Sequence, residues 1–229
     1  QWLQDHLVVA QQTVWRSCGS HSRQHSFSGL VSRRVCIDCN TGWMSKLEAI
    51  AKPVLLSLLE EKTERAIPPD ECAVLARWVL KTVFVLDTTA LNRVVPDQHY
   101  RLLYEGKAPK HTIIAIAYCT EVPSIPSWRQ NQNWTGASRF LDHAQVESSL
   151  EQTYRFTLQI GCLAARVCYF PLNLRLFEYE NGIQYLHPHQ RMDVLWPSKD
   201  SIDSLDAFDQ SLLVVGSCGD EISLWNTDN

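Results

Sequence analysis

Two cysteines separated by two residues, Cys36 and Cys39, are the strongest chemical signal in this chain of 229 residues. A Cys-x-x-Cys turn points both sulfurs at one centre, and structural zinc takes four Cys or His ligands in a tetrahedron. The pair therefore predicts half of a structural Zn²⁺ site. Cys18 and His21 have the same spacing, with 14 residues between the two pairs, which is close to known zinc spacings. They are one source of the other two ligands, and a pair upstream of Gln1 is the alternative.

The cysteine content and the apolar pattern bear on the compartment. The chain has 8 cysteines, but disulfide frameworks belong mostly to much shorter secreted chains, so we expect free thiols in a reducing, cytoplasmic setting. No run of about 18 apolar residues is present, and we therefore expect no membrane span. The first residues show neither the basic segment nor the long apolar core of a signal peptide.

Charge is distributed unevenly along the chain, whose formal net charge is -4. Residues 16–46 carry a net charge of +4, whereas residues 191–229 carry -6. A basic region around the cysteine pair favours a local anionic partner. We predict that DNA or RNA phosphates contact four side chains of this region: Arg23, Arg33, Arg34 and Lys46. An ordinary solvated surface is the alternative interpretation.

The elements that must position these residues are of mixed type. Residues 1–16 have apolar side chains at roughly helical spacing, and residues 25–35 are typical of a strand or hairpin. Asn40 or Thr41 is expected to cap a helix that continues to about residue 62. Pro53 lies inside this helix and should kink it.

Two further helices and several strands are predicted downstream. The helix that opens with Pro68-Pro69-Asp70-Glu71 is apolar nearly all round as far as Ala90, so it should be central and buried. A shorter helix follows Pro96. Predicted strands, judged by β-branched content or alternation, are 112–119, 154–160 and 162–170. We expect a loop at 123–133, a hairpin turn at Asn181-Gly182 and a short helix at 205–214.

The segment from Cys36 to Glu48 (C-x-x-C-N-x-x-W-M-S-x-L-E) resembles the second zinc knuckle of bacterial and phage proteins related to HNH endonucleases. Gln1-Trp2-Leu3 is similar to the end of the segment that follows the first knuckle in that group. Residues 76–82 (A-R-W-x-x-K-T) resemble the group's second helix. The resemblance covers roughly residues 1–95 and implies a ββα-metal unit.

The predicted fold is therefore α+β, in three parts. A zinc-knuckle, ββα-metal-like segment with its helix spans residues 1–62. A domain of a helical hairpin and an antiparallel β-rich region spans residues 63–197, and residues 198–229 form an acidic tail. The helical hairpin and the acidic tail are the places where we expect a protein partner.

The resemblance also implies metal-dependent phosphodiester hydrolysis by the complete protein, with one Mg²⁺ or Mn²⁺ ion stabilising charge on the phosphate. Asn40 matches the metal-side position at the start of the helix. The general-base histidine would precede Gln1, and His25 is the substitute within the chain. We therefore expect the chain by itself to be catalytically incomplete.

Two other functions remain open from the sequence. One is a non-catalytic zinc-knuckle module that binds nucleic acid or protein, and the other is a structural subunit of a larger assembly, without zinc. Other polar residues give weaker signals: Asp87 is interpreted as a helix-end residue, and His99, His111 and His143 have no nucleophile partner in sequence.

Overall fold

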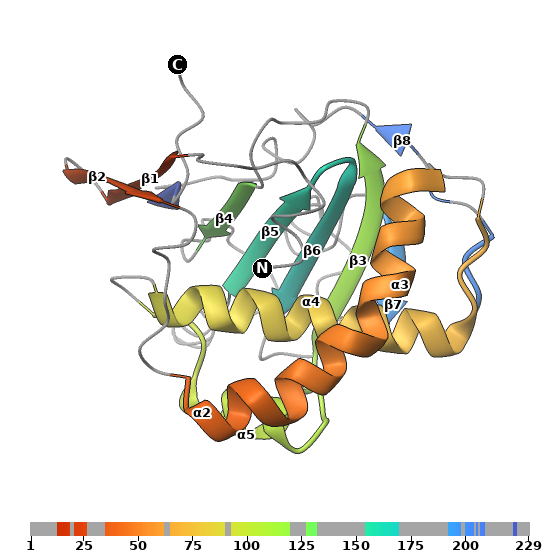
Figure 1. Cartoon of the computed structure of the whole chain (residues 1–229), viewed down its shortest axis with the longest axis horizontal. Helices are drawn as coiled ribbons and strands as arrows, with labels where there is room; N and C mark the ends of the chain where they lie inside the picture. Colours follow the sequence, from red (N-terminus) through yellow and green to blue (C-terminus); the bar gives the residue numbers. More distant parts are fainter. Residues whose placement is uncertain are drawn as a thin grey trace, which may run out of the picture.

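The structure is a computed structural model, and its helices and strands confirm an α+β fold (Figure 1). It describes residues 13–18, 21–26, 35–61, 65–89, 93–119, 127–131, 154–169, 192–197, 200–203, 205, 207–208 and 222–223. The predicted hairpin at Asn181-Gly182 and the predicted nucleic-acid contacts Arg33 and Arg34 lie outside these residues.

The cysteine pair stands at the start of one long helical stretch. Its parts are α2 (Ile37–Cys39), the π-helical turn η2 (Asn40–Met44) and α3 (Ser45–Glu61). The expected cap at Asn40 or Thr41 is wrong, because the helix begins earlier and Cys36 is its N-cap. Pro53 lies inside α3, and Figure 1 shows this helix bending about half-way along its length.

The next two helices agree with the sequence pattern. Helix α4 (Pro69–Thr89) begins with a proline and has two acidic residues in its first turn, where the helix dipole favours negative charge. Helix α5 (Asp97–Tyr104) is followed by Gly106, whose φ of 78° is in the left-handed region. The amides of Gly106 and Lys107 donate to the carbonyls of Leu103 and Leu102, which is a Schellman end.

One sheet holds most of the strands, in the order β7-β3-β6-β5-β4-β9. Neighbours along this order pair antiparallel, and the short strand β8 pairs parallel with the end of β3. The strands are β3 (Thr112–Cys119), β4 (Ser127–Asn131), β5 (Tyr154–Ile160), β6 (Leu163–Tyr169), β7 (Asp193–Trp196), β8 (Ala207–Phe208) and β9 (Ile222–Ser223). The strands predicted at 112–119, 154–160 and 162–170 are confirmed as β3, β5 and β6.

Three local predictions are wrong. Residues 13–16 belong to a strand, because β1 (Thr13–Cys18) pairs antiparallel with β2 (His21–Ser26). The expected loop at 123–133 contains β4, and the expected helix at 205–214 contains β8 at residues 207–208. In each case pairing with another strand satisfies the backbone amides and carbonyls, and the local sequence pattern does not reveal that partner.

The main core lies between α3, α4 and one face of the sheet, and these helices cross the strands in Figure 1. Its largest fully buried side chains include Trp78 and Phe84 of α4 and Tyr154 and Phe156 of β5. A smaller cluster on the other face is formed by Ala115, Ala117, Ala164 and Met192. The stripe predicted for α3 is buried at Leu47, Ala51, Val54 and Leu58, so this helix shares its core with α4 and the sheet.

Two residues of α3 provide a matched test of this packing. Leu55 is 2% exposed and Ile50 is 57% exposed. We expect Leu55→Ala to lower the free energy of unfolding by about 2–5 kcal/mol, because it removes buried methyl groups and leaves a cavity. Ile50→Ala should change it by no more than about 0.5 kcal/mol. Urea unfolding followed by circular dichroism measures both, and equal losses in the two variants would contradict the packing of α3.

Candidate functional site

The Cys36–Cys39 turn has the geometry of a metal-binding thiol pair. Cys36 is exposed at the N-cap, and its sulfur accepts the backbone N–H of Cys39 at 3.1 Å. The amide of Asn40 donates to the carbonyl of Cys36 at 3.0 Å, which closes the turn. Cys39 is partly exposed and lies on the first helical turn. Both sulfurs are therefore accessible from solvent on a rigid backbone.

Hydrogen bonding shifts the pKa values of the two thiols in opposite directions. The bonds that Cys36 receives from Cys39 lower the pKa of the Cys36 thiol. The contact with Cys36, followed by partial burial, raises the pKa of Cys39. A metal binds the thiolate form, so the turn favours the ligand state at Cys36 before any metal arrives.

The proposed second ligand pair lies on a different element. Cys18 and His21 end β1 and begin β2, and their Cα atoms are partners across this hairpin. Figure 1 shows the hairpin well apart from α2. Among the residues that the structure describes, no group of three or more His, Cys, Asp or Glu side chains is placed to hold a metal ion. The assignment of Cys18 and His21 as zinc ligands stays a prediction.

The other predicted site residues are likewise spread over separate elements. Asn40 is exposed at the start of η2, and Lys46 is exposed on the first turn of α3. His25 and Arg23 belong to β2, where they pair across the hairpin with Val14 and Arg16. Because β2 and α2 lie well apart in Figure 1, the structure does not place His25 beside Asn40.

The residues that carry the sequence resemblance connect the cysteine turn to α4. The guanidinium carbon of Arg77 lies 5.5 Å from the centre of the Trp43 ring, a cation–π contact. Glu48 forms an ion pair with Lys81, whose side chain is almost fully buried. Trp43 also meets the edge of Tyr104, with ring centres 6.4 Å apart. The segment therefore fixes the cysteine turn against α4 and the end of α5.

Asp87 is a structural anchor, as its position near the end of a helix predicted. Its carboxylate is fully buried and accepts the amides of Val94 at 3.0 Å and Val95 at 3.4 Å. The hydroxyl of Tyr100 donates to it as well, and the Nε of Arg93 lies 4.0 Å away. Burial raises the pKa of Asp87, although these donors oppose the shift.

A pocket of about 780 Å³ is lined in part by Arg77, the residue that contacts Trp43. Its lining includes His99, which is 3% exposed and has its Nδ1 3.0 Å from the hydroxyl of Tyr154. Sequence reasoning missed this site and treated His99 and His111 as scattered. The local signal was the run of basic residues after the Gly106 turn, at Lys107, Lys110 and His111.

Comparisons with protein families, with curated proteins and with solved structures found no match for this chain. No helix in the described part of the chain is long and apolar enough to cross a membrane.

The buried histidine makes a prediction about pH. Burial lowers the pKa of His99 from 6.5 to about 4, so the folded state holds it neutral where the unfolded chain binds a proton. Because the unfolded chain binds a proton that the folded state does not, the free energy of unfolding falls as the pH falls from 6.5 to 4. The loss is about 3 kcal/mol at most. His99→Gln should abolish this part of the pH dependence in urea unfolding.

The exposed His111 is the matched control. Its φ of 62° is left-handed, and Asn is among the residues that tolerate this conformation, so His111→Asn should retain the pH dependence. NMR titration of the wild-type His99 ring is a second measurement that does not require a stable variant. A midpoint near 6.5 would contradict the neutral, buried state of His99.

Proposed function

We propose that this chain is a zinc-binding, nucleic-acid-binding protein related to HNH endonucleases, in which Cys36 and Cys39 hold Zn²⁺. The observation that supports it best is the thiol pair at the start of a helix, where Cys36 is exposed, Cys39 is partly exposed and the backbone N–H of Cys39 donates to the Cys36 sulfur. The resemblance of residues 36–48 to a zinc knuckle supports the same proposal independently.

The residues of the turn fit zinc as two of its four ligands. When bound, zinc would cross-link the turn to the segment that supplies the remaining ligands, and Cys18 with His21 are the proposed source. Helix α3 is anchored in the core by the apolar side chains of Leu47 and Ala51. Zinc at Cys36 and Cys39 would add a cross-link at the exposed end of this helical stretch.

The residues described do not fit a catalytic Mg²⁺ or Mn²⁺ site. Asn40 is exposed, and His25 lies on β2, apart from the cysteine turn in Figure 1. The non-catalytic binding function is therefore the one we propose for this chain, and metal-dependent hydrolysis is the alternative that the cleavage assay below tests.

The nucleic-acid part of the proposal is supported by basic side chains near the turn. Lys46 is exposed about two helical turns beyond the cysteine pair. Arg23, Arg33 and Arg34 precede the pair in sequence, and the net charge of residues 16–46 is +4. Phosphate contacts of this kind release counterions, so they produce affinity that falls steeply with salt.

Metal analysis tests the zinc proposal directly. We expect about one zinc ion per purified chain, measured by mass spectrometry of the element. Cys36→Ser and Cys39→Ser should each lose it, because a hydroxyl does not replace a thiolate ligand. Asp38→Asn changes the exposed residue between the two cysteines and should retain the zinc. Wild-type protein that neither contains nor takes up zinc would rule the site out.

A salt series tests the phosphate contacts. We expect binding to a DNA or RNA duplex, measured by fluorescence anisotropy, to weaken linearly in a plot of log affinity against log salt. Lys46→Ala should reduce the slope by about 1, the value for one lost phosphate contact. Arg65→Ala is the matched control, because Arg65 already pairs with Glu71 at 2.7 Å. An identical slope for wild type and Lys46→Ala would contradict the contact.

The same preparations separate binding from hydrolysis. Plasmid incubated with Mg²⁺ or Mn²⁺ should stay intact with this chain. Cutting that is lost in the His25→Ala and Asn40→Ala variants would reverse our preference for the non-catalytic function.

A further inference from the structure

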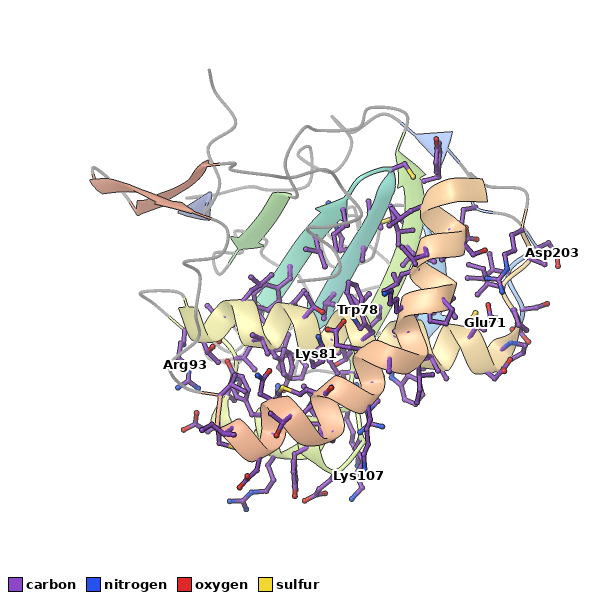
Figure 2. The ribbon with its side chains drawn as sticks, viewed as in Figure 1. Glu71, Trp78, Lys81, Arg93, Lys107 and Asp203 are labelled. Atoms are coloured by element: carbon purple, nitrogen blue, oxygen red, sulfur yellow. The ribbon has the colours of Figure 1, made fainter. Side chains whose placement is uncertain are left out.

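The pocket of about 780 Å³ lies where four parts of the fold meet. Helices α4 and α5 form two walls, the loop after α5 forms a third, and side chains of β3, β6 and β7 close it. Its size is within the range of roughly 300–1,000 Å³ that is typical of sites for small molecules. Lys107 marks the outer edge of this loop below α5 (Figure 2).

The charge of the pocket is of one sign. Its lining contains the cations Arg77, Lys107 and Lys110 together with the imidazole of His111, and none of the lining residues in the described part of the chain is Asp or Glu. Lys107 pairs with Glu105 at 2.8 Å on the exposed side. Within the described part of the chain, no ion pair engages Arg77 or Lys110. Converging cations without carboxylates attract an anion.

Arg77 is held in place as a donor. Its guanidinium carbon lies 5.5 Å from the centre of the Trp43 ring, and this cation–π contact holds the plane of the guanidinium against α4. A planar guanidinium fixed by stacking is also suited to bidentate recognition of phosphate.

The loop after α5 contains two residues whose backbone conformation is left-handed. Gly106 is left-handed and turns the chain out of α5, and the position that a Cβ would occupy there is 3.5 Å from the Arg77 guanidinium. His111 is also left-handed, which is uncommon for a residue with a side chain. Strained positions of this kind cluster at binding sites, because the surrounding structure has to hold them.

The opposite side of the pocket is aromatic. Tyr169 on β6 and Trp196 on β7 lie on the two strands that flank β3, where they pair with Thr112 and Ile114. Trp196 is 40% exposed. His99 lies between α5 and these strands, with its ring centre 4.5 Å from that of Tyr169. A flat, aromatic group can stack on these rings while an attached anion meets the cations.

We propose that this pocket binds a phosphorylated nucleoside, either as a free mononucleotide or as one nucleotide of a strand. The base stacks on Trp196 or Tyr169, and the phosphate is held by Arg77, Lys110 and His111. None of these residues belongs to the zinc turn, so the pocket does not rest on the zinc proposal. If the ligand is part of a strand, the pocket becomes a second contact with nucleic acid.

Binding of three small probes to the full chain tests the two halves of the pocket separately. The probes are adenosine 5′-monophosphate, adenosine and inorganic phosphate, titrated by isothermal calorimetry with tryptophan fluorescence as a second readout. Lys110→Ala should weaken the monophosphate and inorganic phosphate about tenfold and leave adenosine unchanged. Trp196→Leu should weaken the monophosphate and adenosine about tenfold and leave inorganic phosphate unchanged. Arg65→Gln, outside the pocket, should alter none of them.

A short single-stranded oligonucleotide with a 5′-phosphate distinguishes the two sources. If it binds at least tenfold more tightly than the monophosphate and is weakened by both variants, the ligand is a strand. If the monophosphate binds as well as the oligonucleotide, the ligand is a free nucleotide. Monophosphate binding no tighter than that of inorganic phosphate, or unchanged in both variants, would overturn the proposal.

Zinc-stripped protein separates this result from the zinc proposal, because retained binding of the monophosphate shows that the pocket acts alone. A Cys36→Ser variant that loses zinc but binds the monophosphate like wild type would establish two independent sites.

Discussion

The buried carboxylate of Asp87 determines how helices α4 and α5 meet, and the rest of the described structure depends on that junction. Asp87 is fully buried near the end of α4, yet it accepts two backbone amides from the segment that leads into α5 and a hydroxyl from α5 itself. An isolated buried charge is costly, so its donors are strongly constrained to remain in place. This anchor fixes the direction of α5, and α5 carries His99 and Leu103 into the core and the pocket wall.

Helix α4 has two chemically different sides. One side presents Trp78 and Phe84 to the aromatic side chains of the sheet, where burial supplies most of the stabilisation. The other side presents Arg77 and Lys81 to the segment that follows the cysteines, through the contacts with Trp43 and Glu48. The cysteine turn is thereby held against a packed helix, which is what the ligand geometry of the proposed zinc site would require.

The sequence predicted the parts of the fold whose pattern is local. Helix α4 and strand β3 were found because long apolar or β-branched runs with clear end signals leave few alternatives. Strand β4 was missed because its residues are mostly polar. Strand β1 was missed because its apolar residues also fit a helical spacing, and both segments become strands by pairing with another segment. The cap was assigned to Asn40 or Thr41 because sulfur is rarely considered as an acceptor for backbone amides. The pocket could not be found at all, since Arg77, His111 and Trp196 meet only after four elements have packed.

The cationic side chains of this fold differ in whether they are paired with a carboxylate. Arg65, Lys81 and Arg93 each form an ion pair with a carboxylate, so each pair has no net charge. Around the pocket, Arg77 and Lys110 have no such carboxylate partner among the described residues, and the backbone is left-handed at Gly106 and His111. In a chain with a net charge of -4 there was no shortage of acidic residues to neutralise Arg77 and Lys110, so a compensating anion is the simplest physical reason for the arrangement.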